Sequence, residues 1–203
     1  MRRKTILKLT CIIAITALIT GVTLAYFTDA TSVKTNTFTV SDGLSIKLAE
    51  PTWDNLDYDG DAAGITEDLG EDLADNIVPG RTIPKDPSVL NDSENDDVWV
   101  AIKLAYSGTA NSFALINAFA DINFDTVGWE AKDATNTVFY YKTQLEPDDE
   151  TTDLFTRVLI DTTAANGDLK PFTINIKAYA VQAEGLTYAD AKTQLDTLMT
   201  TSP

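Results

Sequence analysis

Histidine is missing from this chain of 203 residues, and cysteine occurs once, at Cys11. Histidine is the side chain that most often serves as a general base at neutral pH, and histidine and cysteine are the usual zinc ligands in proteins. Without histidine the chain cannot carry the His-Glu-x-x-His motif of zinc peptidases. A single cysteine also cannot close a disulfide within the chain, so no disulfide framework is expected.

Basic side chains are also few, since 15 Lys and Arg stand against 31 Asp and Glu, and the formal net charge is −16 at pH 7. Four of the basic residues lie within the first eight positions, so the rest of the chain is more acidic still. Such a charge repels nucleic-acid phosphates and anionic membrane surfaces, and we expect no nucleic-acid partner. It suits a soluble extracellular protein that resists premature association.

The first 25 residues have the three parts of a secretory signal peptide. An apolar run covers residues 6–22, and Thr23 and Ala25 place small side chains where a signal peptidase binds. We expect cleavage between Ala25 and Tyr26, which leaves no stable membrane span. The alternative is an uncleaved anchor, because residues 9–27 approach the ~20 apolar residues of a spanning helix. The cationic start consists of Arg2, Arg3, Lys4 and Lys8.

A Thr-rich segment, the N-terminal arm, follows the expected cut over residues 26–40. Thr and Val favour extended backbone, and Phe27, Val33, Phe38 and Val40 place apolar side chains along it. Such an arm can add as a strand to the sheet edge of another subunit, where main-chain hydrogen bonds supply affinity and side chains supply register. Alternatively, the arm is the first strand of its own domain.

Residues 41–203 are expected to form a single domain, because their number lies in the usual range of ~100–200 residues. Short β-prone runs separated by turns predict a mainly β fold, an antiparallel, jelly-roll-like β-sandwich. The run 98–106 should be central, and prolines make 81–90 an edge strand. We expect these two to pair as a hairpin. The other predicted strands are 44–48, 129–130, 137–142, 156–161 and 172–181.

Two short helices are expected within this domain. Ser112 can cap a helix near residues 112–120. Thr187 and Asp190 can form the capping interaction of a C-terminal helix over residues 187–199, which should lie across one end of the sandwich. The acidic segment 50–75 is expected to be a loop with little regular structure, since loops of that length are usually functional or mobile.

The acidic segment also contains the best ligand pattern in the chain. Asp57, Asp59 and Asp61 surround Gly60 and could turn three carboxylates toward a hard cation such as calcium. The glutamate of an EF-hand loop is absent at the expected distance, where Asp68 stands. A solvated acidic loop is the alternative, and no other cofactor is expected. Glycoside hydrolysis needs two carboxyl groups at a fixed separation, and no spacing of Asp and Glu in this sequence identifies such a pair.

Three stretches resemble the TasA/camelysin family, secreted proteins of Gram-positive bacteria. The first is residues 23–29 (TLAYFTD), and the last is residues 179–185 (YAVQAEG). Between them lies a pattern of separate positions: Tyr140, Tyr141, Lys142, Leu145, Pro147, Thr151, Thr152, Leu154, Phe155 and Val158. The resemblance implies processing by a dedicated SipW-type signal peptidase and localisation to the extracellular matrix or cell surface. It also implies a homo-oligomeric fibre, with accessory matrix proteins as further partners.

The leading hypothesis is therefore a secreted structural subunit that polymerises into biofilm-matrix fibres. Assembly would use donor-strand insertion of the N-terminal arm after the signal peptide is removed. One alternative is a secreted camelysin-like metallopeptidase or carboxylate-based hydrolase, although the lack of His, and of Cys beyond the leader, predicts that the chain is not an enzyme. Another alternative is a calcium-dependent cell-surface binding module.

Overall fold

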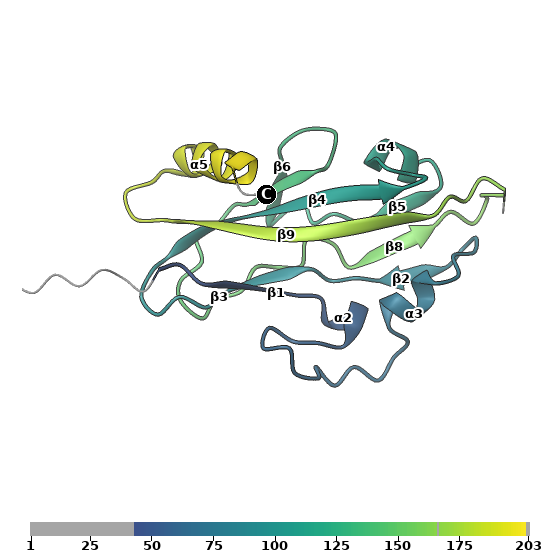
Figure 1. The fold of residues 1–203 in the computed structure, drawn as a ribbon, viewed down its shortest axis with the longest axis horizontal. Helices are drawn as coiled ribbons and strands as arrows, with labels where there is room; N and C mark the ends of the chain where they lie inside the picture. The colour runs from purple at the N-terminus through teal and green to yellow at the C-terminus, as the bar shows by residue number, and fades with distance from the viewer. Residues whose placement is uncertain (1–42, 166, 202–203) are drawn as a thin grey trace, which may run out of the picture. The chain divides into compact units, whose positions relative to one another are not determined.

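Nine strands and four helices make up the part of the chain that the computed structural model describes, residues 43–165 and 167–201 (Figure 1). The predicted processing site at Thr23, Ala25 and Tyr26 lies outside the described residues. The same holds for the four apolar residues of the N-terminal arm, Phe27, Val33, Phe38 and Val40.

The strands form three antiparallel sheets, which confirms the predicted mainly β fold class. The largest has the order β6-β7-β4-β9, formed by Trp129–Ala131, Val138–Tyr141, Val98–Gly108 and Phe172–Gln182. A second has the order β2-β8-β5, formed by Thr82–Pro84, Arg157–Ile160 and Ala120–Ile122. The third pairs β1, Ile46–Ala49, with β3, Ser88–Asn91.

Strand β4 is central, as its β-branched and aromatic composition predicts. It pairs with β7 on one side and along its whole length with β9 on the other, from Val98↔Gln182 to Gly108↔Phe172. Alternate residues of β4 point into the main core, which also receives buried side chains from β2, β3, β5 and β8. The inward residues are Val98, Val100, Ile102 and Leu104, each at most 1% exposed.

The predicted hairpin between residues 81–90 and 98–106 is wrong. The predicted single edge strand 81–90 is two strands in different sheets. Strand β3 pairs with β1, and β2, which contains Pro84, pairs with β8 at the edge of its sheet. The reason lies at Asn91, which is fully buried. Its Nδ2 donates to the carbonyl oxygens of Asp96 and Leu145, and its Oδ1 accepts from the Ser93 amide. These bonds fix residues 92–97, which connect β3 to β4. The connection leads the chain from the two-stranded sheet into the four-stranded sheet, so β3 and β4 do not form a hairpin.

Helix α5, Tyr188–Thr201, has the predicted capping interaction, with the Thr187 hydroxyl 2.6 Å from Oδ2 of Asp190. It lies on the outer face of the four-stranded sheet, not across one end of the sandwich (Figure 1). That face of the sheet carries aromatic and small apolar side chains that need cover from water. The second core formed there contains Trp99, Ala101, Tyr140, Tyr179, Ala183, Ala191, Leu195 and Met199.

The acidic segment 50–75 contains two short helices, so the expectation of little regular structure is wrong at its ends. Helix α2, Pro51–Asp54, starts on a proline and ends at Asn55 in the left-handed conformation. Oδ1 of Asp86 accepts from the Thr52 amide at 3.0 Å, which fixes the first turn. Helix α3 covers Gly70–Ala74.

Helix α4, Phe113–Ile116, is capped by Ser112, whose hydroxyl accepts from the Leu115 amide at 3.4 Å. The predicted cap is therefore present, but the helix is shorter than the expected 112–120. It ends early because Ala120 already pairs with Ile160 as the first residue of β5.

Candidate functional site

Strand β9 is the longest edge strand in the described part of the chain, with 11 residues and β4 as its one sheet neighbour there. Its outer edge carries backbone donors and acceptors that a further strand can pair with. Its inner face is apolar but only half-buried, although it packs against the main core. The inner-face residues are Phe172, Ile174, Ile176, Ala178 and Ala180.

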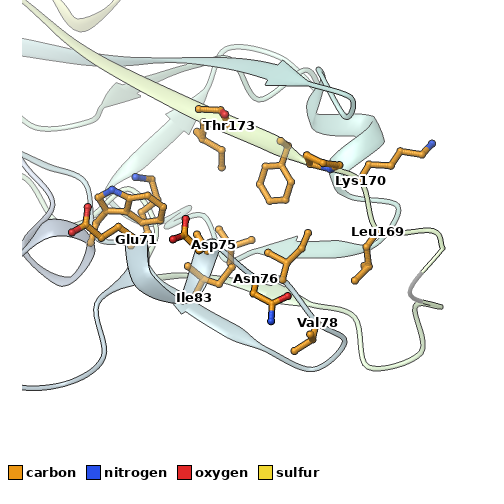
Figure 2. A pocket seen from close by; sticks show the side chains of 16 residues that line it. Glu71, Asp75, Asn76, Val78, Ile83, Leu169, Lys170 and Thr173 are labelled. Carbon is orange, nitrogen blue, oxygen red and sulfur yellow. The ribbon is translucent and has the colours of Figure 1, made fainter.

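A pocket of about 740 Å³ opens beside the first residues of β9 (Figure 2). One wall is formed by α3 and the residues that follow it, including Asp75 and Asn76. The opposite wall is the segment 169–174, with Lys170 and Thr173. We call this pocket, together with the edge of β9 that no described strand pairs with, the β9 groove.

The β9 groove opens onto the main core. Two of its lining residues, Ile83 and Val158, are each 3% exposed. Five further apolar lining residues touch the core while remaining half-exposed: Ala74, Ile77, Leu169, Phe172 and Ile174. Covering such surface gains roughly 25 cal/mol per Å² removed from water. The groove is therefore suited to an apolar, extended occupant.

Trp53 and Lys85 also line the pocket. Lys85 Nζ lies 4.0 Å from the centroid of the Trp53 ring and 2.7 Å from Oε1 of Glu50. A Cβ added to Gly70 would lie 2.7 Å from Cε3 of the same ring. Because the indole is already engaged by a cation and a close backbone, it does not offer a free platform for a sugar.

Two carboxyl groups, those of Glu50 and Asp153, have raised pKa values, and the Asp86 carboxylate contributes to both shifts. Burial raises the pKa of Glu50, and Asp54 and Asp86 add to this against the opposing effect of Lys85. Burial also raises the pKa of Asp153 to about 6, with further contributions from Asp86, Glu150 and Asp125.

The predicted calcium ligands are arranged as a turn. Oδ1 of Asp57 accepts from the amides of Asp59 and Asp61, both at 2.9 Å. Asp59 is paired with Lys47 at 2.7 Å, and Lys47 also contacts Asp92. Across residues 43–165 and 167–201, no group of three or more His, Cys, Asp or Glu could hold a metal ion. The structure does not bring the three carboxylates together, and calcium binding there stays a prediction.

The β9 groove was not predicted from the sequence. Its lining comes from segments separated by more than a hundred positions, from Trp53 to Ile174. The one local signal was the proline content around β2, which marks an edge strand beside the pocket.

Comparison of the chain with protein-family models, with curated proteins and with solved structures gives no match. Among the residues that the structure describes, no helix has the length and apolar character needed to cross a membrane. The observations that bear on function are therefore the sequence patterns and the β9 groove.

Proposed function

We propose that this protein is a secreted structural subunit that polymerises into extracellular biofilm-matrix fibres. The N-terminal arm of one subunit, residues 26–40, adds as a strand in the β9 groove of the next. The observation that carries the proposal is the half-exposed apolar face of β9 beside a sheet edge with which no strand of residues 43–165 and 167–201 pairs. An added strand would form hydrogen bonds with the backbone groups at the edge of β9, and its side chains would cover the apolar face.

The arm has the side chains that such a groove needs. Phe38 and Val40 are two residues apart, so in an extended strand they lie on one face. Phe172 and Ile174 have the same spacing on the inner face of β9. A phenylalanine that becomes fully buried contributes about 1.5–3 kcal/mol, so Phe27 and Phe38 would both strengthen the association.

The geometry of this exchange favours a filament. The arm and the groove are different surfaces, so their contact is heterologous and does not close on itself unless the rotation permits a ring. Before cleavage after Ala25, the signal peptide holds the arm at the membrane, and removal of the signal peptide frees it. Processing therefore acts as the switch for assembly in this proposal.

The test compares a protein that starts at Tyr26 with one that starts at Ser41, by circular dichroism and electron microscopy. Both should fold, and the longer one should form fibres. A peptide of residues 26–40 added to the shorter protein should bind it without producing fibres. Fibres from the shorter protein would show that the arm is not the donor, and failure of the shorter protein to fold would make the arm its own first strand.

Export is tested separately by replacing Ala25 with glutamate. A large charged side chain at the cleavage position should block the signal peptidase and leave a membrane-bound precursor. Thr28→Glu, beyond the expected cut, serves as the control. Normal secretion of the Ala25→Glu protein would count against cleavage at this position.

A further inference from the structure

The pair formed by Lys85 and Glu50 differs from every other ion pair among the described residues by its burial. Its side chains are 6% and 17% exposed, whereas those of Lys192 and Glu130 are 29% and 40% exposed. The indole of Trp53 covers the ammonium group at 4.0 Å. Water therefore has little access to the two reactive ends.

Both residues are held by the backbone on either side of the contact. The Glu50 carbonyl accepts from the Trp53 amide at 2.8 Å, at the start of α2. The Lys85 amide donates to the Thr156 carbonyl at 3.2 Å, beside β2. The side-chain ends meet at 2.7 Å, yet Oε1 of Glu50 has no partner in hydrogen-bond geometry. The nitrogen thus lies against the carboxyl group without the alignment of a hydrogen bond.

The surroundings favour the neutral acid at Glu50. Burial raises the pKa of its carboxyl group, the ammonium group of Lys85 opposes this, and the carboxylates of Asp54 and Asp86 add to the rise. Passing one proton from Nζ to the Glu50 carboxylate converts two buried charges into a neutral amine and a neutral acid. A neutral amine is a nucleophile, and a neutral carboxyl group can lose a hydroxyl group as water.

We propose that Lys85 and Glu50 become joined by an isopeptide bond between Nζ and Cδ. The amine attacks Cδ, a carbon–nitrogen bond forms, and one carbon–oxygen bond of the carboxyl group breaks. The oxygen leaves as water with one proton from the acid and one from the amine, so no oxidant or other reactant is needed. Holding the two groups in contact supplies the high effective concentration that such a reaction requires.

The bond would close a covalent loop from residue 50 to residue 85 and fasten α2 to the edge strand β2. It would restrict the unfolded chain as a disulfide does, in a protein whose one cysteine lies at position 11. Its existence does not depend on fibre formation, so the two proposals can fail separately.

The test is the intact mass of the purified, denatured protein that starts at Tyr26. The expected mass is lower than the sequence mass by one water molecule. Trypsin should release residues 48–81 linked to residues 82–103, because an acylated Lys85 is not cleaved. A full sequence mass, together with a free peptide 82–85, would overturn the proposal.

Variants locate the bond. Lys85→Arg should restore the full mass calculated for its own sequence, since a guanidinium does not form the amide. Lys192→Arg is the matched control, because Lys192 Nζ lies 2.9 Å from Oε1 of Glu130 in an exposed pair. The mass of the Lys192→Arg protein should still be one water molecule below the mass calculated from its sequence. If Lys85→Arg still lacks one water, the bond lies elsewhere and the assignment to Lys85 is wrong. The parent mass decides the question even if Lys85→Arg does not fold.

Discussion

The phenol of Tyr140 on β7 donates a 2.6 Å hydrogen bond to Oδ1 of Asp196 on α5. The same carboxylate oxygen lies 2.8 Å from Nζ of Lys132. Burial acts to raise the pKa of Asp196, but the bonds from Lys132 and Tyr140 outweigh it and lower the pKa. This polar contact marks the rim of the second core, in which Leu195 is 1% exposed. The helix is therefore attached by an apolar centre and a charged edge.

The apolar centre should matter more for stability than the edge. Leu195→Ala leaves a cavity under α5 and should lower the free energy of unfolding by about 2–5 kcal/mol. Tyr140→Phe removes one hydrogen bond and should cost about 1 kcal/mol. Urea unfolding followed by circular dichroism measures both changes. An equal decrease in the free energy of unfolding of the two variants would contradict the greater importance of the apolar centre.

Asp153 should make stability depend on pH. Its pKa is raised to about 6, mainly by burial and then by Asp86, Glu150 and Asp125. The folded protein holds this proton more tightly than the unfolded chain does, so the contribution of Asp153 to stability is full below about pH 4 and is lost as the pH rises through about 6.

Asp153→Asn removes this charge. Because the side chain is partly exposed, we expect a gain of only about 1 kcal/mol at pH 7.5 and little change at pH 4. Thermal unfolding at both pH values measures the difference. Asp121→Asn, which removes one carboxylate at an exposed position, is the matched control. A gain of the same size at both pH values would mean that the charge of Asp153 is not the cause.

Gly70 should not tolerate a side chain. A Cβ at this position would clash with the carbonyl oxygen of Pro84 and lie against Trp53. Gly70→Ala should therefore push α3 away from β2 and cost about 1–3 kcal/mol, as overpacking does elsewhere. Gly167→Ala is the matched control, since nothing lies within 4 Å of the Cβ that it adds. Calorimetric melting of both variants tests the expectation, and equal melting temperatures would refute it.

The proposed insertion of the arm predicts that polar substitution inside the β9 groove weakens fibre formation more than folding. Ile174 lines the pocket and is half-buried, so Ile174→Asn removes apolar surface that the arm would cover. Asn175→Ala changes the next residue of β9, whose side chain is exposed, and serves as the control. Sedimentation and electron microscopy should show fibres for the control and folded monomer for Ile174→Asn. Normal fibres from a folded Ile174→Asn protein would exclude this part of the groove as the contact.

Long β-branched runs were predictable from the sequence, and strand partners were not. Strands β4 and β9 match their predicted ranges closely, because ten or so consecutive residues carry a clear pattern. Strand β5 has three residues directly after a helical pattern, which is too short for any periodicity. The partner of β3 depended on the buried side chain of Asn91, whose contact with Leu145 lies 54 positions away.

The residues of the candidate site were hidden for the same reason. Lys85 stands between prolines in a polar stretch that is typical of an exposed turn. Its burial arises only when Glu50 and Trp53, both more than thirty positions earlier, fold over it. Local composition therefore indicated the edge position of β2 correctly, but it predicted one strand where β2 and β3 are separate, and it gave no indication of the pocket beside them.

The pairing of β4 with β9 also determines when the domain can fold. Residues 98–108 have to wait for residues 172–182 before the central strand gains its longest partner. Contacts over such separations slow folding, because closing the long intervening loop costs chain entropy before the strands gain their contacts. A ribosome that has made the first 150 residues has therefore produced a chain whose main sheet is still incomplete. The complete four-stranded sheet therefore becomes available only after residues 172–182 have been synthesised.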